Sequence, residues 1–188
     1  MRSVPSAALV FALAGSLWTS IAPAVLASGR REGLPALDGA RGDSVDTRCS
    51  APQRRQFDFW IGRWTVTDTS GATVGHSEIT RVADGCGILE HWQGADGSSG
   101  SSLNTYDPQA GHWSQFWVGG GGLVLRLEGG LRGRAMVLSG HRRSRRGPLE
   151  DRITWTPAGD GTVRQVWEIS VDGGSSWRTV FDGLYRAS

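Results

Sequence analysis

The chain has 188 residues, with 20 basic and 18 acidic side chains and a formal net charge of +2. A charge this close to neutral creates no global field that would draw the protein to nucleic acid, so no nucleic-acid partner is predicted. Every basic residue is arginine, and the absence of lysine excludes Schiff-base chemistry on a lysine amine.

The first 27 residues have the organisation of a secretory signal peptide. Arg2 supplies positive charge, an apolar stretch spans 7–17, and small residues precede a cleavage point after Ala27, with Ala24 as the second choice. An uncleaved membrane anchor is the alternative, but the apolar stretch is too short to cross about 30 Å of hydrocarbon, and Pro23 follows it. We therefore predict a periplasmic or secreted protein, with no stable membrane insertion once residues 1–27 are removed.

Residues 28–50 are rich in Gly, Arg and Asp and show almost no apolar periodicity, so we predict a flexible leader before a folded domain at 51–188. The chain has two cysteines, Cys49 and Cys86, and in an oxidising compartment a disulfide is the expected state. This bond would close a loop of about 38 residues and stabilise the fold by about 4 kcal/mol in the chain-entropy model. A catalytic thiol is the alternative, but neither cysteine has a base in a recognisable arrangement.

From residue 57 onward the sequence consists of short runs rich in Val, Ile, Thr, Trp and Tyr, separated by turns that contain Gly and Asp. Runs spaced about ten residues apart predict an antiparallel meander, and no stretch shows a sustained helical period. Ten such strands must close into a barrel or stack as a sandwich, and sequential hairpins favour an all-β, up-and-down barrel. The predicted strands are 58–68, 72–83, 86–94, 99–106, 112–118, 123–128, 134–142, 149–156, 162–171 and 176–186.

Several of these runs place tryptophan and a single polar side chain on the same face, because alternate residues of a strand share a face. A barrel interior that holds an amphiphilic ligand would have this character. A core packed solid with Trp and hydrogen-bonded Gln side chains would have it as well, and the sequence leaves both open. The candidate wall residues are Trp64, Glu90, Trp92, Trp113, Gln115, Trp117, Arg126, Arg152, Gln165 and Trp167.

The motif Gly62-Arg63-Trp64, preceded by Phe57-Asp58-Phe59-Trp60, resembles the signature of lipocalins and, more broadly, calycins. Together with Cys-Gly-Ile-Leu-Glu-His-Trp at 86–92, Arg-Ile-Thr-Trp at 152–155, Arg-Gln-Val-Trp at 164–167 and Phe-Asp-Gly-Leu-Tyr at 181–185, it resembles an uncharacterised family of bacterial exported proteins with a lipocalin-like barrel. The resemblance covers roughly residues 49–186. It implies that Trp64 closes one end of the barrel and that Gly62 permits close packing beneath it. It implies export and fold but no activity and no catalytic residues.

Two further motifs have a simple structural interpretation. Residues 170–177 fit the Asp-box pattern S-x-D-x-G-x-[ST]-W, which predicts a hairpin whose turn is held by the Asp172 side chain. The cluster at 141–146, His-Arg-Arg-Ser-Arg-Arg, predicts a solvated hairpin loop, and binding to phosphate or anionic lipid is the functional alternative.

The histidines do not predict a metal site. His76, His91, His112 and His141 lie far apart in the sequence, without HxH or HExxH spacing. A cross-strand site formed by Glu90, His91 and His112 is the remaining alternative, and no cofactor is predicted.

Three functions remain open from the sequence. The first is a small-molecule binder with a Trp-lined cavity for a hydrophobic or amphiphilic ligand. The second is a calycin-type enzyme, an isomerase or hydrolase, that uses Glu90 with Arg126 or Arg152 as acid/base and anion stabiliser. The third is an envelope interaction protein with a filled core that acts through the 141–146 loop. An interior cavity would favour the first two over the third.

Overall fold

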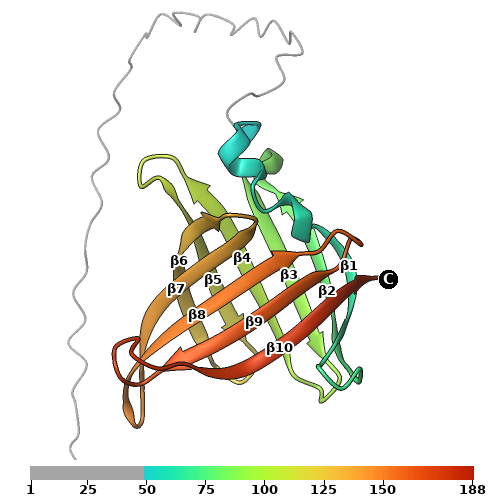
Figure 1. Ribbon diagram of the computed structural model, residues 1–188. Helices are drawn as coiled ribbons and strands as arrows, with labels where there is room; N and C mark the ends of the chain where they lie inside the picture. The colour runs from blue at the N-terminus through green and yellow to red at the C-terminus, as the bar shows by residue number, and fades with distance from the viewer. Residues whose placement is uncertain (1–48) are drawn as a thin grey trace, which may run out of the picture. The chain divides into compact units, whose positions relative to one another are not determined.

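The structure is a computed structural model that describes residues 49–188, and over these residues ten antiparallel strands close into an up-and-down barrel (Figure 1). This architecture confirms the predicted fold class. The predicted signal peptide, and the predicted leader as far as residue 48, lie outside the described residues. Short 3-10 helices, η2 (Pro52–Arg55), η3 (Asp58–Trp60) and η4 (Ala83–Gly85), complete the described secondary structure.

Each predicted run contains a strand. The strands are β1 (Gly62–Thr67), β2 (Thr73–Val82), β3 (Gly87–Gly94), β4 (Ser99–Asp107), β5 (His112–Gly119), β6 (Val124–Arg132), β7 (Ala135–Ser144), β8 (Gly147–Pro157), β9 (Val163–Ser170) and β10 (Arg178–Ala187). The start of the first run is wrong, because residues 58–60 form η3 instead of strand. Trp60 N–H donates to the Phe57 carbonyl (3.1 Å) and Ile61 N–H to the Asp58 carbonyl (3.1 Å), so the chain turns before β1 begins.

Each strand pairs with its neighbours in sequence, and β1 also pairs with β10, which closes the sheet. The closing register runs from Trp64 opposite Ala187 to Thr67 opposite Leu184. A closed barrel leaves no unpaired strand edge, which removes the usual route to edge-to-edge aggregation.

Aspartate side chains hold several of the hairpin turns. Asp68 accepts hydrogen bonds from the Ser70 hydroxyl (2.6 Å) and from the backbone N–H groups of Ser70 (2.8 Å) and Ala72 (3.0 Å). The hydroxyl bond, and secondarily the backbone bonds, hold the pKa of Asp68 below its ordinary value. The Asp-box prediction is confirmed in the β9–β10 hairpin, where Asp172 accepts from the backbone N–H (2.9 Å) and the hydroxyl (2.6 Å) of Ser176. This local chemistry explains why the turns could be located from the sequence.

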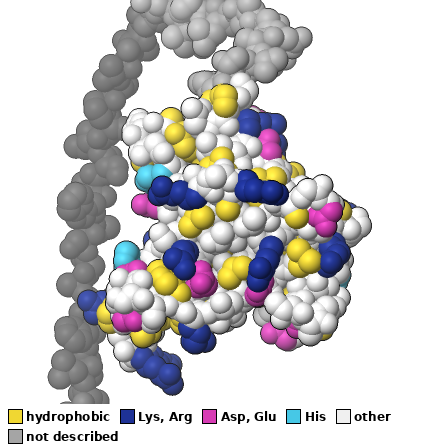
Figure 2. Space-filling model, viewed as in Figure 1, with side chains coloured by type: hydrophobic (Ala, Val, Ile, Leu, Met, Phe, Trp, Pro, Cys, Tyr) yellow, Lys and Arg dark blue, Asp and Glu magenta, His cyan; other side chains and the backbone are white. Residues whose placement is uncertain are grey.

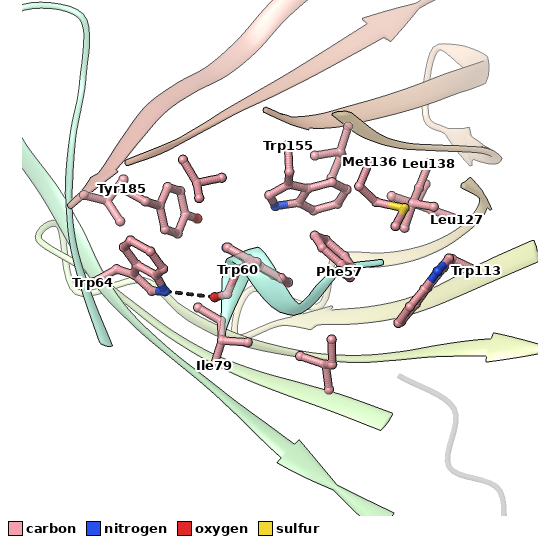
Figure 3. Packing of buried hydrophobic residues seen from close by; sticks show 14 of the residues in the cluster. Phe57, Trp60, Trp64, Ile79, Trp113, Leu127, Met136, Leu138, Trp155 and Tyr185 are labelled. Carbon is pink, nitrogen blue, oxygen red and sulfur yellow. Dashed lines mark hydrogen bonds between the residues drawn. The ribbon is translucent and has the colours of Figure 1, made fainter. Parts of the chain in front are cut away.

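One end of the barrel is filled by aromatic side chains from the segment that precedes β1. Phe57 and Trp60 are fully buried, and their rings stack with centroids 4.9 Å apart (Figure 3). Phe57 also contacts Trp113 and Trp155 edge-on, with centroids 5.7 and 5.1 Å away. We call Phe57 and Trp60 the plug. The aromatic run that resembled a lipocalin strand therefore closes the barrel end instead.

Trp64, which the resemblance placed at the closed end, lies beside the plug. Its indole N–H donates to the Trp60 carbonyl (2.9 Å), and its ring packs against Tyr185 with centroids 6.2 Å apart (Figure 3). Gly62 has a φ of +149°, a conformation that L side chains rarely adopt, so the backbone favours glycine here. A Cβ at this position would lie 3.4 Å from the Trp64 ring, which is an ordinary contact distance, so the packing does not require glycine.

A disulfide joins Cys49 to Cys86, as predicted, with Cα atoms 4.7 Å apart. It ties the segment before η2 to the start of β3. The Asp58 carboxylate forms ion pairs with Arg55 and Arg81, and the Arg54 guanidinium donates to the Cys86 carbonyl (3.3 Å). The plug is thus held by covalent, ionic and packing contacts together.

Candidate functional site

A cavity of about 400 Å³ occupies the barrel interior on the side of Trp155 and Tyr185 away from the plug. These two rings contact Trp60 on one side and line the cavity on the other, so they form its floor. The lining continues to Ala95 and Ser98 in the β3–β4 loop, at the end of the barrel opposite η3. The interior is therefore closed at one end and hollow toward the other. A volume of this size lies in the range of about 300–1,000 Å³ that is typical of small-molecule sites.

The upper wall of the cavity is aromatic. Trp92 from β3 and Phe181 from β10 meet edge-on with centroids 5.9 Å apart, and Trp117 from β5 lines the same cavity. Glycine on the neighbouring strand makes room for these rings. A Cβ at Gly75 would lie 2.6 Å from the Trp92 ring, and one at Gly100 would lie 2.2 Å from the Trp117 ring. The ring positions are thus fixed by strand pairing as well as by side-chain packing.

A buried carboxylate, Glu90, lies on the cavity wall within a chain of polar side chains. Its two oxygens accept hydrogen bonds from the hydroxyls of Ser77 (3.1 Å) and Ser102 (2.8 Å). The Asn104 amide donates to the Ser102 hydroxyl (3.0 Å), and the Gln115 amide donates to the Asn104 carbonyl oxygen (2.7 Å). The network crosses the inner face from β2 to β5 and holds Glu90 in one orientation.

Burial raises the pKa of Glu90 to about 7, although the hydrogen bonds from Ser102 and Ser77 act in the opposite direction. Desolvation disfavours the charged form, and two neutral hydroxyls compensate for it only in part. Burial, and secondarily the charge of Glu90, raise the pKa of the Tyr185 hydroxyl well above its ordinary value. Tyr185 therefore stays neutral and donates to the Gln165 carbonyl oxygen (2.5 Å).

A second buried carboxylate, Asp151, holds the tryptophan on the opposite wall. Its oxygens accept from the Arg142 guanidinium (2.7 and 3.3 Å) and from the Trp167 indole N–H (2.9 Å). Asp151 is 1% exposed and Arg142 24%. The predicted hairpin loop at 141–146 is wrong for residues 141–144, which continue β7 and pair with β8. Arg142 is also not solvated as predicted, because it lies on the inner face of β7, the face that carries Met136 and Leu138.

Six of the predicted wall residues line the cavity: Glu90, Trp92, Gln115, Trp117, Gln165 and Trp167. Trp64 and Trp113 face inward but belong to the packed core around the plug. Their assignment to the cavity wall is wrong because η3 fills that end of the barrel. The alternation of residues along each strand correctly predicts that these side chains face inward. It does not show how far along the barrel axis the packed core around the plug extends.

The two predicted arginines lie outside the barrel. Arg126 is exposed between buried Leu125 and Leu127, and its guanidinium lies over the Phe116 ring at 5.0 Å. Their prediction as wall residues is wrong because the positions next to buried residues on a strand point outward.

Arg152 on β8 also points outward. It lies between the buried Asp151 and Ile153, donates to the Glu168 carboxylate (2.9 and 3.0 Å), and stacks on the Trp177 ring at 3.9 Å. Glu90 therefore has neither predicted arginine beside it, and the acid/base and anion-stabilising pair proposed from the sequence is not assembled.

The cross-strand metal alternative is also not assembled. Glu90 points into the barrel, whereas His91 is exposed and bonds with the Ser101 hydroxyl (3.0 Å) on the outer face. His112 lies 3.7 Å from Glu128, also outside the cavity lining. Within residues 49–188, no three His, Cys, Asp or Glu side chains come together in a way that could hold a metal ion.

Sequence reasoning missed Phe181, Trp155, Tyr185 and the pair of Arg142 and Asp151. The signal was present: Asp151, Ile153 and Trp155 alternate on β8, and Phe181, Gly183 and Tyr185 alternate on β10. The period-two alternation of these strands places their aromatic rings inside the barrel.

Comparison with protein-family models finds no match for the chain, and comparison with curated proteins finds none either. Among residues 49–188, no helix has the length and apolar character needed to cross a membrane. The geometry of the cavity is therefore the basis on which a function is proposed.

The raised pKa of Glu90 predicts an unusual dependence of stability on pH. The folded protein keeps a proton on Glu90 between pH 4.5 and about 7, where the unfolded chain has released it. This contribution to stability is complete below about pH 4.5 and is lost as pH rises through about 7. Glu90→Gln, which keeps the shape and remains neutral, is expected to be more stable than the parent at pH 8 by up to about 3 kcal/mol and by about 1 kcal/mol at pH 5.

Urea unfolding of the ligand-free protein at both pH values measures this difference, with Glu128→Gln on the outer face as the matched control. A control that shows the same pH-dependent gain, or a Glu90→Gln variant that shows none, would contradict the assignment.

Proposed function

We propose that the protein is an exported barrel that binds a small hydrophobic or amphiphilic molecule. The observation that carries this proposal is the cavity of about 400 Å³, closed by the plug at one end and walled by Trp92, Trp117, Trp167 and Phe181. Sites of this kind combine apolar walls with a few polar groups that orient the ligand, and Glu90 and Gln165 are such groups here.

Two observations support the exported setting. Residues 1–27 have the organisation of a signal peptide, and the Cys49–Cys86 disulfide is of the kind that persists in oxidising compartments. A hollow interior disfavours the alternative of an interaction protein with a filled core. The outward position of Arg126 and Arg152 removes the arginine that the enzyme hypothesis required.

Ligand binding in the cavity can be tested with the neutral fluorescent probe N-phenyl-1-naphthylamine. We expect its emission to rise on titration into the oxidised protein and the tryptophan emission to fall, because four tryptophans line the cavity: Trp92, Trp117, Trp155 and Trp167. Native mass spectrometry of protein exported by a bacterial host is expected to show an added small-molecule mass that disappears on denaturation.

A matched pair of variants tests whether the probe binds inside the cavity. Ile153 lines the cavity, and Ile153→Phe adds a ring inside it, whereas Thr154→Phe adds the same ring at the neighbouring, outward position. We expect Ile153→Phe to weaken probe binding roughly tenfold, since it removes cavity volume and costs about 1–3 kcal/mol of strain, and Thr154→Phe to leave it unchanged. Absence of probe binding and of any retained mass in the parent protein would overturn the proposal, as would equal loss in both variants.

A further inference from the structure

The cavity wall has a charge composition opposite to that of the chain as a whole. The sequence contains 20 arginines and no lysine. Yet of the described residues that line the cavity, two are carboxylates, Glu90 and Asp96, and none is Arg or His. Arg142 faces inward on β7 but does not line the cavity, and Asp151 neutralises it.

The arginines gather instead on the outside of the barrel. Arg152 pairs with Glu168 (2.9 Å) and Arg164 with Asp182 (2.5 Å). Figure 2 shows basic side chains spread over this face, several of them beside acidic ones. The outer surface therefore offers mixed charge, whereas the cavity lining holds two carboxyl groups and no basic side chain. Glu90 carries its negative charge above about pH 7.

Glu90 is 4% exposed, lines the cavity, and has no basic side chain as a hydrogen-bond partner among residues 49–188. The groups packed around it are neutral: Ser77 and Ile79 from β2, Ser102 from β4, and Tyr185 from β10. A buried carboxylate without a counter-ion is costly, and a ligand that supplies a positive charge removes that cost.

The walls favour a cation for a second, independent reason. Aromatic rings attract cations through their π faces, and tryptophan does so most strongly. Trp92, Trp117 and Phe181 line the cavity between Glu90 and the loop at its mouth, where Asp96 adds a second negative charge. Hydrogen bonds from Ser98 are the main cause of a lowered pKa at Asp96, so this carboxylate stays ionised.

We infer that the ligand is a cationic amphiphile, a protonated amine whose ammonium group binds Glu90 while its apolar body lies against Trp92, Trp117 and Phe181. The inference rests on the proposed function and narrows it to one ligand class. A primary ammonium group fits better than a quaternary one, because the Ser77 and Ser102 hydroxyls hold a carboxylate that can accept an N–H donor.

A pH dependence follows from this arrangement. Protonation of Glu90 removes the charge that attracts the ammonium group, and an alkyl ammonium group itself stays charged through this range. Affinity for the amine is therefore expected to rise between pH 5 and pH 8, in the same interval where the empty protein loses stability. Affinity for a neutral analogue is expected to stay constant.

The experiment uses isothermal titration calorimetry at pH 8 on the oxidised protein with three probes that share one apolar body: 4-phenylbutylamine, 4-phenylbutan-1-ol and 5-phenylpentanoate. We expect the amine to bind at least roughly tenfold more tightly than the alcohol, as for a charge-assisted hydrogen bond, and the carboxylate to bind most weakly. The trimethylammonium derivative of the amine is expected to fall between the amine and the alcohol.

Two variants test whether the preference for the amine over the alcohol depends on Glu90. Glu90→Gln is expected to abolish the preference of amine over alcohol while the affinity for the alcohol stays within about twofold, and Glu128→Gln on the outer face is expected to preserve the preference. A neutral probe that binds while the amine shows no advantage, or a preference that survives Glu90→Gln, overturns the cationic assignment and leaves the proposed function standing. Failure of N-phenyl-1-naphthylamine and all three probes to bind overturns both.

Discussion

Replacing Trp60 with alanine is expected to lower the free energy of unfolding by about 4 kcal/mol, within the range of about 3–5 kcal/mol for a fully buried tryptophan. Trp60 is 0% exposed, stacks on Phe57 at 4.9 Å and contacts Trp155 and Tyr185 at 5.3 and 6.4 Å. The short helix η3 cannot collapse into the resulting void, because the disulfide and the Asp58 ion pairs hold it in place. Guanidinium chloride unfolding of the oxidised protein measures the loss.

Phe59 provides the matched control, since it lies in the same helix but is only partly buried and contacts Phe57 from the side at 5.5 Å. Phe59→Ala is expected to cost about 1 kcal/mol, in proportion to its smaller buried area. Because Trp155 and Tyr185 are supported by Trp60 from below, Trp60→Ala is also expected to weaken binding of N-phenyl-1-naphthylamine. Equal losses in the two variants would show that the plug contributes no more than a surface contact.

Most of the barrel could be predicted because its signals are local. Turn residues such as Asp68 and Asp172 lie at the ends of the runs and bond their own turn amides, so strand number and order follow from the sequence. Residues 58–60 could not be placed in this way. Phe59 and Trp60 have the composition of a strand, and η3 forms because the chain must turn there to cover the barrel end, which is a tertiary requirement.

The sequence predicts on which face of each strand the site residues lie, but it does not predict how deep along the barrel axis they lie. Alternation along β3, β5 and β9 correctly placed Glu90, Gln115 and Trp167 on the inner face. The same alternation places Arg126 and Arg152 on the outer face, because the residues on either side of each arginine are buried. Depth along the barrel axis is set by how far the plug extends, and no period in the sequence encodes that distance, so Trp113 was assigned to the wall.

The pair of Arg142 and Asp151 was hidden for a different reason. Arg142 belongs to the His-Arg-Arg-Ser-Arg-Arg cluster at 141–146, which has the composition of a solvated loop. Only its position on the inner face of β7 distinguishes it from Arg143 next to it. The carboxylate that binds it is reached across the strand pair, with Arg142 opposite Leu149 and Asp151 opposite Gly140. Diagonal contacts of this kind depend on pairing register, which the hydrophobic pattern of the strands and the turn fix together.

Arg142→Ala is expected to destabilise the protein by about 3–5 kcal/mol, because it leaves the Asp151 carboxylate buried without its counter-ion. Asp151 is 1% exposed and would retain only the Trp167 N–H as a hydrogen-bond donor. The control is Arg143→Ala, which removes the same charge from the exposed, outward position beside it and is expected to change stability by less than about 0.5 kcal/mol. Urea unfolding at pH 7 of both variants gives the comparison.

A second variant separates loss of the ion pair from loss of packing. Asp151→Asn combined with Arg142→Leu removes both charges, while the asparagine oxygen can still accept from the Trp167 indole N–H. The double variant is expected to recover most of the stability lost in Arg142→Ala, because neutral groups in this position carry no uncompensated charge. It is also expected to retain probe binding, since Trp167 keeps its place on the cavity wall. Recovery of stability without retention of binding would show that the charged pair is needed to hold Trp167 in its binding position. Failure to recover stability would show that the Arg142–Asp151 ion pair itself stabilises the fold, since the leucine keeps an aliphatic contact at position 142.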